Sequence, residues 1–285
     1  MGRPCEDRRP DPVGGSTAFA GARCAENQEV RAIEAEHYYQ RAQEQLALDR
    51  EAALPETRRA WERAMLASYA GVRRVADAIG SDYDVLPDAR VRLRGPAPDG
   101  SETLPEDWSR AFYLTMVLRD RARCRDLCDI PPGIVAHVAR DGTPRGSVRT
   151  RNWIDSLQSY VLDLPGLVQS LEFLIGTPWG DDPLLRRHDH AGNLLSVMRL
   201  LFELECYDPE GVEEHLVRAL TEFTDFREKR RAGDPGARVP EFPLELMALA
   251  CRARDMDQWD EDFTFSVRSP LLPDGMLSDT WNPSR

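Results

Sequence analysis

The residues best suited to metal chemistry are acids and histidines between positions 181 and 190. They are Asp181, Asp182, His188, Asp189 and His190. Carboxylates and imidazoles bind divalent metals, but no cysteine or third histidine lies nearby, and alternate residues of a helix do not share a face. We therefore expect no metal or other cofactor. A metal-dependent all-α enzyme that uses the paired aspartates and the two histidines is the alternative.

The densest acidic cluster lies towards the C-terminal end of the sequence. It consists of Asp255, Asp257, Trp259, Asp260, Glu261 and Asp262. A calcium loop of the EF-hand type needs a central glycine and a terminal glutamate, and both are missing here. Aromatic anchors are enriched at protein interfaces, so a tryptophan inside an acidic run favours partner binding. We predict that this cluster contacts a basic partner, and a solvated acidic loop is the alternative.

Sequence motifs of common enzyme classes are absent. The chain has no Gly-x-Ser-x-Gly, no P-loop and no His-Glu-x-x-His. Six cysteines occur without a Cys-x-x-Cys pair, and Cys124 and Cys128 are four residues apart, which places them on one helix face. Buried free thiols are the expectation for such a pair in a cytosolic chain. The sequence therefore predicts no catalytic residues.

Charge is distributed unevenly along the chain. Of the net charge of −12, residues 151–285 carry −11 and residues 1–150 carry −1. A nucleic-acid-binding protein normally presents a basic face, so we expect a basic protein partner and no direct contact with nucleic acid. Acidity that only maintains solubility is the alternative. No apolar run reaches the roughly 18–20 residues of a membrane span, and no secretory signal opens the chain, so we predict a cytoplasmic protein without membrane contact.

One apolar stretch is expected to organise the fold. Residues 104–131 predict a single long helix, and seven of the eight residues from 111 to 118 are apolar, with only Thr115 interrupting. A helix that is apolar on all sides is normally buried. Arg119 and Asp120 follow directly. Asp120 can reach Arg123, whereas Arg119 faces a like charge and needs a partner on another helix, so we predict a structural role for both.

The remaining segments predict an all-α protein of antiparallel helical hairpins around this central helix. Short loops between helices favour antiparallel neighbours. The expected helices cover residues 28–51, 55–79, 134–139, 153–164, 167–175, 184–207, 209–231 and 243–254. A small β-hairpin is expected near 89–104, with strands at 91–94 and 101–104, and a short strand at 263–267 in an otherwise irregular segment from Asp255 onwards. Residues 1–27 predict a disordered tail and 28–285 one helical domain.

The central stretch resembles a known family. Asp107-Trp108 opens an apolar helix that ends in Arg119-Asp120, and Leu127-Cys128-Asp129-Ile130-Pro131 follows. This order resembles the Imm49 family, the immunity proteins of bacterial polymorphic toxin systems that are frequent in actinobacteria. Four further segments agree in order: Trp153 to Tyr160, Leu194 to Phe202, Asp208-Pro209-Glu210-Gly211 and Pro243 to Cys251. The likeness covers roughly 105–260.

The resemblance implies a helical, non-catalytic protein that binds and neutralises a cognate toxin inside the producing cell. Such toxins are often nucleases with basic clefts, which agrees with the acidity of this chain. Trp108, Arg119, Asp120 and Trp153 match positions of the family pattern, and we interpret them as scaffold. A helical scaffold or regulatory protein with no toxin partner is a second alternative, beside the metal-dependent enzyme.

Overall fold

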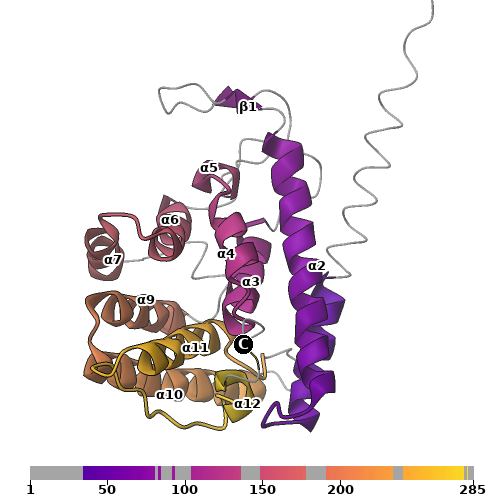
Figure 1. Cartoon of the computed structure of the whole chain (residues 1–285), viewed down its shortest axis with the longest axis vertical. Coiled ribbons are helices and arrows are strands. Elements are labelled where there is room, and N and C mark those ends of the chain that lie inside the picture. The colour runs from indigo at the N-terminus through magenta and orange to yellow at the C-terminus, as the bar shows by residue number, and fades with distance from the viewer. Residues whose placement is uncertain are drawn as a thin grey trace, which may run out of the picture.

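Helices account for nearly all regular structure in the computed structural model (Figure 1), which confirms the predicted all-α class. The structure describes residues 35–80, 83–84, 92–93, 104–135, 148–177, 191–233, 240–278 and 281. The first helix covers 35–48. The others are α2 (Pro55–Gly80), α3 (Leu104–Val117), α4 (Arg121–Cys128), α5 (Pro132–Val135), α6 (Val148–Leu162), α7 (Leu167–Gly176), α9 (Ala191–Cys206), α10 (Pro209–Gly233), α11 (Leu244–Trp259) and α12 (Asp274–Leu277).

Helix α3 is the buried centre that the sequence predicts. It packs against α2 on one side and α11 on another, and Figure 1 shows α9, α10 and α11 together beside its C-terminal half. Trp108, Phe112 and Leu114 are fully buried, and the Trp108 and Phe112 rings stack with centroids 5.0 Å apart. Trp108 Nε1 also donates a hydrogen bond to the Leu127 carbonyl at 3.0 Å. The predicted scaffold role of Trp108 therefore has a direct structural basis.

The prediction of one continuous helix over 104–131 is wrong. Helix α3 ends at Val117 and α4 begins at Arg121. Arg119 has a φ of 53°, which is outside the helical region, and Asp120 caps α4 by accepting a hydrogen bond from the Arg123 backbone at 3.0 Å. The Arg-Asp pair thus ends one helix and starts the next. As predicted, the Asp120 carboxylate also pairs with the Arg123 guanidinium.

Helices α9 and α10 form a hairpin whose turn follows the predicted signal. Tyr207 has a φ of 60° and stops α9, and Asp208 caps α10 by accepting a hydrogen bond from the Gly211 backbone at 3.1 Å. Pro209 occupies the first position of α10, where a missing N–H costs nothing. Helices α6 and α7 form a second hairpin, separated by a turn that contains Pro165 and a left-handed Gly166 (φ 90°). The buried Trp153 lies on α6.

A two-stranded antiparallel hairpin is present, but its pairing differs from the prediction. Strand β1 (Tyr83–Asp84) pairs with β2 (Arg92–Leu93), with Tyr83 opposite Leu93. The second strand lies inside the predicted 91–94 segment. Its partner precedes it in the chain. Of the expected partner strand at 101–104 only Leu104 is among the described residues, and it begins α3.

The C-terminal region is more helical than the sequence suggests. Helix α11 continues to Trp259, so the irregular segment starts five residues later than predicted. The predicted strand at 263–267 is wrong as well. Phe263, Phe265 and Val267 are buried in alternation, but the Phe265 and Ser266 backbone N–H groups donate to carboxylates of Asp257 and Glu213. The alternation is that of a strand, but no strand among the described residues pairs with this segment.

The last described segment returns to the beginning of the helical array. The Gly275 backbone N–H donates to the Glu51 carbonyl at 2.9 Å, and Trp281 Nε1 donates to the Ala52 carbonyl at 3.1 Å. Helix α12 is thereby held between α11 and the turn before α2. Within the described ranges, none of the helices combines the length and apolar character needed to cross a membrane.

Candidate functional site

Arg119 and Asp255 form a buried ion pair between the end of α3 and α11. Arg119 Nε lies 3.2 Å from Asp255 Oδ1, and the two side chains are 3% and 11% exposed. The remaining guanidinium donors meet backbone carbonyls of Val117 (2.9 Å), Met276 and Leu277 (3.4 Å). The prediction that Arg119 needs a partner on another helix is confirmed.

The surroundings of this pair determine which of its groups are charged. Burial alone would lower the pKa of Arg119, but Cys251 and Asp255 raise it. Burial raises the pKa of Cys251 to about 11, so that thiol is neutral at pH 7 and Asp255 is the counter-ion. A buried charge left without a partner is strongly destabilising. This arrangement therefore fixes how α3, α11 and α12 sit together.

The predicted acidic cluster does not form one surface. Asp255 points inwards to Arg119, so it is not available to a partner. Asp257 is half-buried, pairs with Arg254, and accepts a hydrogen bond from the Phe265 backbone at 3.3 Å. Both residues hold the C-terminal region in place. The Trp259 side chain lies outside what the structure describes.

The other three acids lie at the end of α11 and do face outwards. Asp260 accepts a hydrogen bond from the Tyr207 hydroxyl and another from the Asp262 backbone at 2.9 Å, while Glu261 and Asp262 are exposed. The hydrogen bond from Tyr207 lowers the pKa of Asp260, and the same bond raises the pKa of Tyr207 to about 12. We call Tyr207, Asp260, Glu261 and Asp262 the acidic patch.

Tyr207 was not predictable as part of this patch. It lies on the α9–α10 turn, 53 residues before Asp260, and its ring packs edge-on against Phe263 at 5.3 Å. Tyr207 is nevertheless 45% exposed, which is high for a large aromatic residue. The acidic patch therefore combines fixed carboxylates with an aromatic surface.

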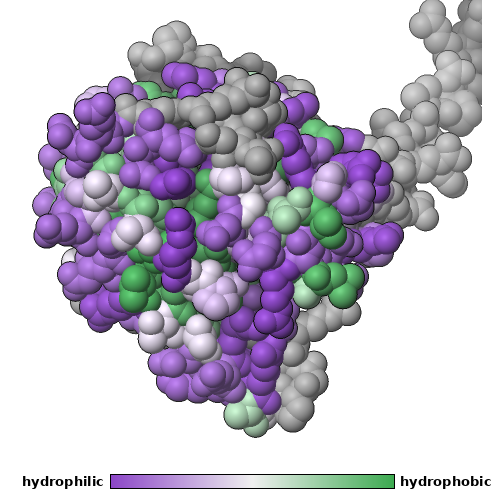
Figure 2. All heavy atoms as spheres, turned by 60° about the horizontal axis from the view of Figure 1, so that its bottom comes forward, coloured by the Kyte–Doolittle hydropathy of each residue, from purple (hydrophilic) through white to green (hydrophobic). Residues whose placement is uncertain are grey.

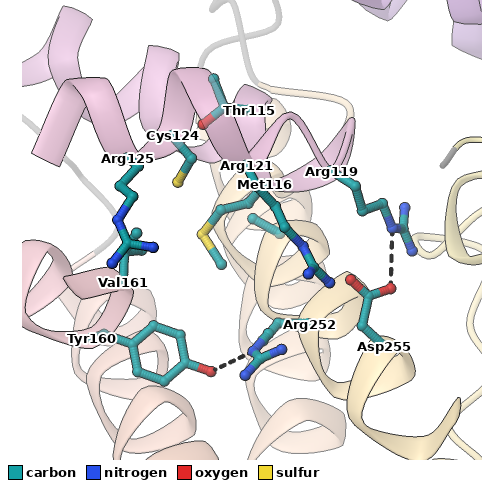
Figure 3. Close-up of a pocket in the computed structure, with 11 residues that line it drawn as sticks. Thr115, Met116, Arg119, Arg121, Cys124, Arg125, Tyr160, Val161, Arg252 and Asp255 are labelled. Atoms are coloured by element: carbon teal, nitrogen blue, oxygen red, sulfur yellow. Dashed lines mark hydrogen bonds and ion pairs between the residues drawn. The ribbon is translucent and has the colours of Figure 1, made fainter. Parts of the chain in front are cut away.

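A second candidate site is a recess of about 330 Å³ between α3, α4, α6 and α11, shown in Figure 3. Its lining comprises Thr115, Met116, Arg119, Arg121, Cys124, Arg125, Tyr160, Val161, Ala248, Arg252 and Asp255. Four of these residues are arginines and only one is an acid. We call this recess the arginine pocket, and its charge is opposite to that of the whole chain.

Hydrogen bonding orients one side of the arginine pocket. Arg252 Nε donates to the Tyr160 hydroxyl at 3.1 Å, and Figure 3 shows this contact beneath Arg121 and Arg125. Burial alone would lower the pKa of Arg252, but Tyr160 and Asp255 raise it, so the guanidinium remains charged. Burial raises the pKa of Tyr160, which keeps its hydroxyl protonated. The spacing of Arg121 and Arg125 places them on one helix face, whereas nothing in the sequence links them to Arg252.

The residues of the alternative metal-dependent enzyme are not among those that the structure describes. Asp181, Asp182, His188 and His190 fall outside the described residues, and within the part of the chain that is described no three histidine, cysteine or acidic side chains gather as metal ligands. The sulfurs of Cys124, Cys128 and Cys251 are free and buried, and Cys206 is free and exposed. The prediction of buried free thiols is confirmed for Cys124 and Cys128.

Helices packed around one buried helix, with charge concentrated in an outward acidic patch and an arginine-lined recess, define an all-α protein with a charged surface. The chain matches the family model of Imm49, described as Immunity protein 49, over residues 49–276. The protein belongs to this family, which confirms the resemblance of the central stretch. No curated protein and no solved structure matches the chain significantly. The matched region includes Arg119, Asp255, the acidic patch and the arginine pocket.

Proposed function

We propose that this protein is a non-catalytic immunity protein that binds a cognate toxin and neutralises it in the cytoplasm of the producing cell. The match to the Imm49 family over residues 49–276 is the observation that carries the proposal. The net charge of −12 adds to it, because an acidic inhibitor is steered towards a basic target such as a nuclease cleft.

The acidic patch is the surface that we propose for toxin binding. Asp260 is held by Tyr207 and by the Asp262 backbone, so its carboxylate is already oriented before a partner arrives. Preorganised groups lose less conformational freedom on binding. Asp255 and Asp257 support this surface from within rather than contacting the partner. Figure 2 shows a face that is mostly hydrophilic, with smaller apolar areas near its centre, and such a surface favours recognition by charge over recognition by an extended apolar area.

Co-expression with the toxin tests the function itself. A toxin gene adjacent to this one is induced in a host with and without the intact protein, and complex formation is measured with the purified pair. We expect growth to be restored and a stable complex to form. If growth is not restored and no complex forms, the proposed function is wrong.

Neutralising two charges of the acidic patch tests the surface. The variant Glu261→Gln/Asp262→Asn keeps side-chain size and removes two exposed carboxylates. We expect the association rate to fall about tenfold at low salt, because steering depends on local charge, and the difference to shrink at high salt. Surface plasmon resonance across a salt series measures the association rate and its dependence on salt.

The variant Asp225→Asn/Glu228→Gln is the matched control. It removes the same charge from exposed positions on α10. A rise of 1.5 Å per residue puts these positions about 25 Å and about 30 Å along the helix from Asp208, at the far end of α10 from the acidic patch. Equal slowing in both variants would mean that net charge alone steers the toxin. Unchanged rates in the patch variant, with neutralisation intact, would place the toxin-binding surface elsewhere.

A further inference from the structure

The arginine pocket concentrates positive charge in a protein that is otherwise acidic. Asp255, the one acid in its lining, is already the counter-ion of Arg119. Arg121 and Arg125 stand one turn apart on α4, where like charges repel. Within the described residues Arg125 has no ion pair with a carboxylate, although Glu205 lies within electrostatic range of Arg252. An anion in this recess would lie among guanidinium groups that outnumber the acids of the lining by four to one.

The donors that face the recess differ in kind and direction. Figure 3 shows the guanidinium groups of Arg121 and Arg125 extending down from α4, and that of Arg252 extending from α11 towards Tyr160. The Tyr160 hydroxyl accepts a hydrogen bond from Arg252, so its own proton is left to donate to a bound group. Guanidinium forks match the oxygens of carboxylates and phosphates. Three such forks around one recess exceed what a single carboxylate can occupy.

The size of the recess and its apolar wall indicate that the ligand has an uncharged portion beside its oxyanion. The volume of about 330 Å³ lies at the lower end of the range for small-molecule sites, roughly 300–1,000 Å³. Met116, Val161 and Ala248 line it beside the charged groups. A ligand that fills the recess therefore combines a multiply charged oxyanion with an uncharged portion that packs against these side chains.

We propose that the arginine pocket binds a phosphorylated small molecule of about mononucleotide size, with its phosphate oxygens between Arg121, Arg125 and Arg252 and a hydrogen bond from Tyr160. The acidic patch contributes no residue to this pocket, so the proposal goes beyond toxin binding and stands or falls independently of it. Arg119 and Asp255 also line the recess, so we expect ligand binding to raise the stability of the whole fold.

Isothermal titration calorimetry of the full chain tests this proposal with inorganic phosphate, pyrophosphate, AMP and ADP, and with adenosine and citrate as comparisons. We expect saturable one-to-one binding of at least one phosphorylated probe, no binding of adenosine, and a melting temperature raised by about 2–4 °C at saturating ligand. Tightest binding of phosphate or pyrophosphate would identify the oxyanion as the whole determinant, and tightest binding of AMP or ADP would show that the apolar wall contributes.

Three variants establish that the binding belongs to this pocket. Arg121→Gln/Arg125→Gln is expected to abolish it, and Tyr160→Phe to weaken it about tenfold, because a hydrogen bond to a charged group is lost. Arg50→Gln/Arg74→Gln removes two exposed arginines from the turn after the first helix and from α2 and is expected to bind normally. The proposal is overturned if no phosphorylated probe binds below about 10 mM, which is weaker than ordinary ligand sites. Undiminished binding by the Arg121/Arg125 variant, an equal loss in the control, or preference for citrate would overturn it as well.

Discussion

Arg119 adopts a backbone conformation that arginine rarely takes, and its side chain explains why. A residue other than glycine in the left-handed region costs of order 1–3 kcal/mol. Here the φ of 53° directs the guanidinium to Asp255 and to the Met276 and Leu277 carbonyls. Hydrogen bonds to a charged group in a buried setting are worth more than neutral ones, so they offset the backbone strain. The strain is therefore part of how α3 connects to α11 and α12.

Removing only the acid of this pair is expected to destabilise the fold strongly. Asp255→Ala leaves the Arg119 guanidinium buried without a counter-ion, and we expect the free energy of unfolding to fall by about 3–5 kcal/mol. Urea unfolding followed by circular dichroism measures it. Removing both charges in Arg119→Met/Asp255→Leu is expected to cost less than the single change, because no buried charge remains. A loss below about 1 kcal/mol in Asp255→Ala would mean that the pair behaves like a surface salt bridge.

At the scale of elements, the turn between the first helix and α2 is built on one carboxylate. Asp49 accepts hydrogen bonds from the Ala53 backbone (3.2 Å), the Leu54 backbone (2.9 Å) and the Thr57 hydroxyl (2.6 Å). Partial burial alone would raise the pKa of Asp49, but these hydrogen bonds lower it below its ordinary value of 3.8. Asp49 thus caps the start of α2 from outside the helix.

Asp49→Asn is expected to lower the free energy of unfolding by about 1 kcal/mol at pH 7, the usual cost of weakening a helix cap. Because the pKa of Asp49 is lower in the folded state, its contribution is fully present above about pH 4, the pKa of an unfolded aspartate, and is lost as the pH falls further. The difference between the two proteins in thermal unfolding should therefore shrink below pH 4. A difference that stays constant from pH 7 to pH 3 would mean that the charge of Asp49 is irrelevant.

Elements with a local signal were predictable, and elements fixed by distant residues were not. The apolar face of α2 and the cap at Asp208 follow from neighbouring residues, and both agree with the structure. The break at Arg119 depends on acceptors 136 to 158 residues away, so the local pattern predicts a continuous helix. The same distance explains why Asp255 was assigned to the surface. Phe263 to Val267 alternate like a strand, but only a neighbouring strand could make them one.

The same distinction between local and distant residues applies to the candidate sites. Glu261 and Asp262 were predictable as exposed acids, because they form part of a contiguous charged run. Tyr207 and the arginine pocket were not, since each is assembled by helices far apart in the chain. Sequence periodicity indicates which face of a helix is buried, but it does not indicate which helix lies opposite.

At the scale of the whole molecule, the C-terminal segment closes onto the turn before α2. Gly275 lies directly against the backbone carbonyls of Glu51 and Ala52, and a Cβ atom at Gly275 would overlap them. Backbone atoms cannot move aside as a flexible side chain can. The absence of a side chain at Gly275 is therefore required for α12 to reach Arg119 while it contacts the first turn.

Gly275→Ala is expected to lower the free energy of unfolding by about 1–3 kcal/mol, the usual cost of overpacking, and to expose the C-terminal segment to limited proteolysis. Gly71→Ala is the matched control. No atom lies within 4 Å of a Cβ added at Gly71 in the middle of α2, so this change is expected to stabilise by about 0.5–1 kcal/mol. Differential scanning calorimetry compares the melting temperatures of the two variants. Equal values would show that the contact at Gly275 is dispensable.

The connection between Arg119 and α12 also has a consequence during protein synthesis. The Met276 carbonyl that Arg119 binds is made 157 residues later, which corresponds to about 8–30 s of translation at ~5–20 residues per second. Asp255 is made 136 residues after Arg119, so the end of α3 lacks its counter-ion for most of that interval and lacks two of its acceptors until the end of it. A nascent chain therefore passes most of its synthesis with its central helix incompletely anchored, and only chains whose C-terminal segment has left the ribosome can reach the final fold.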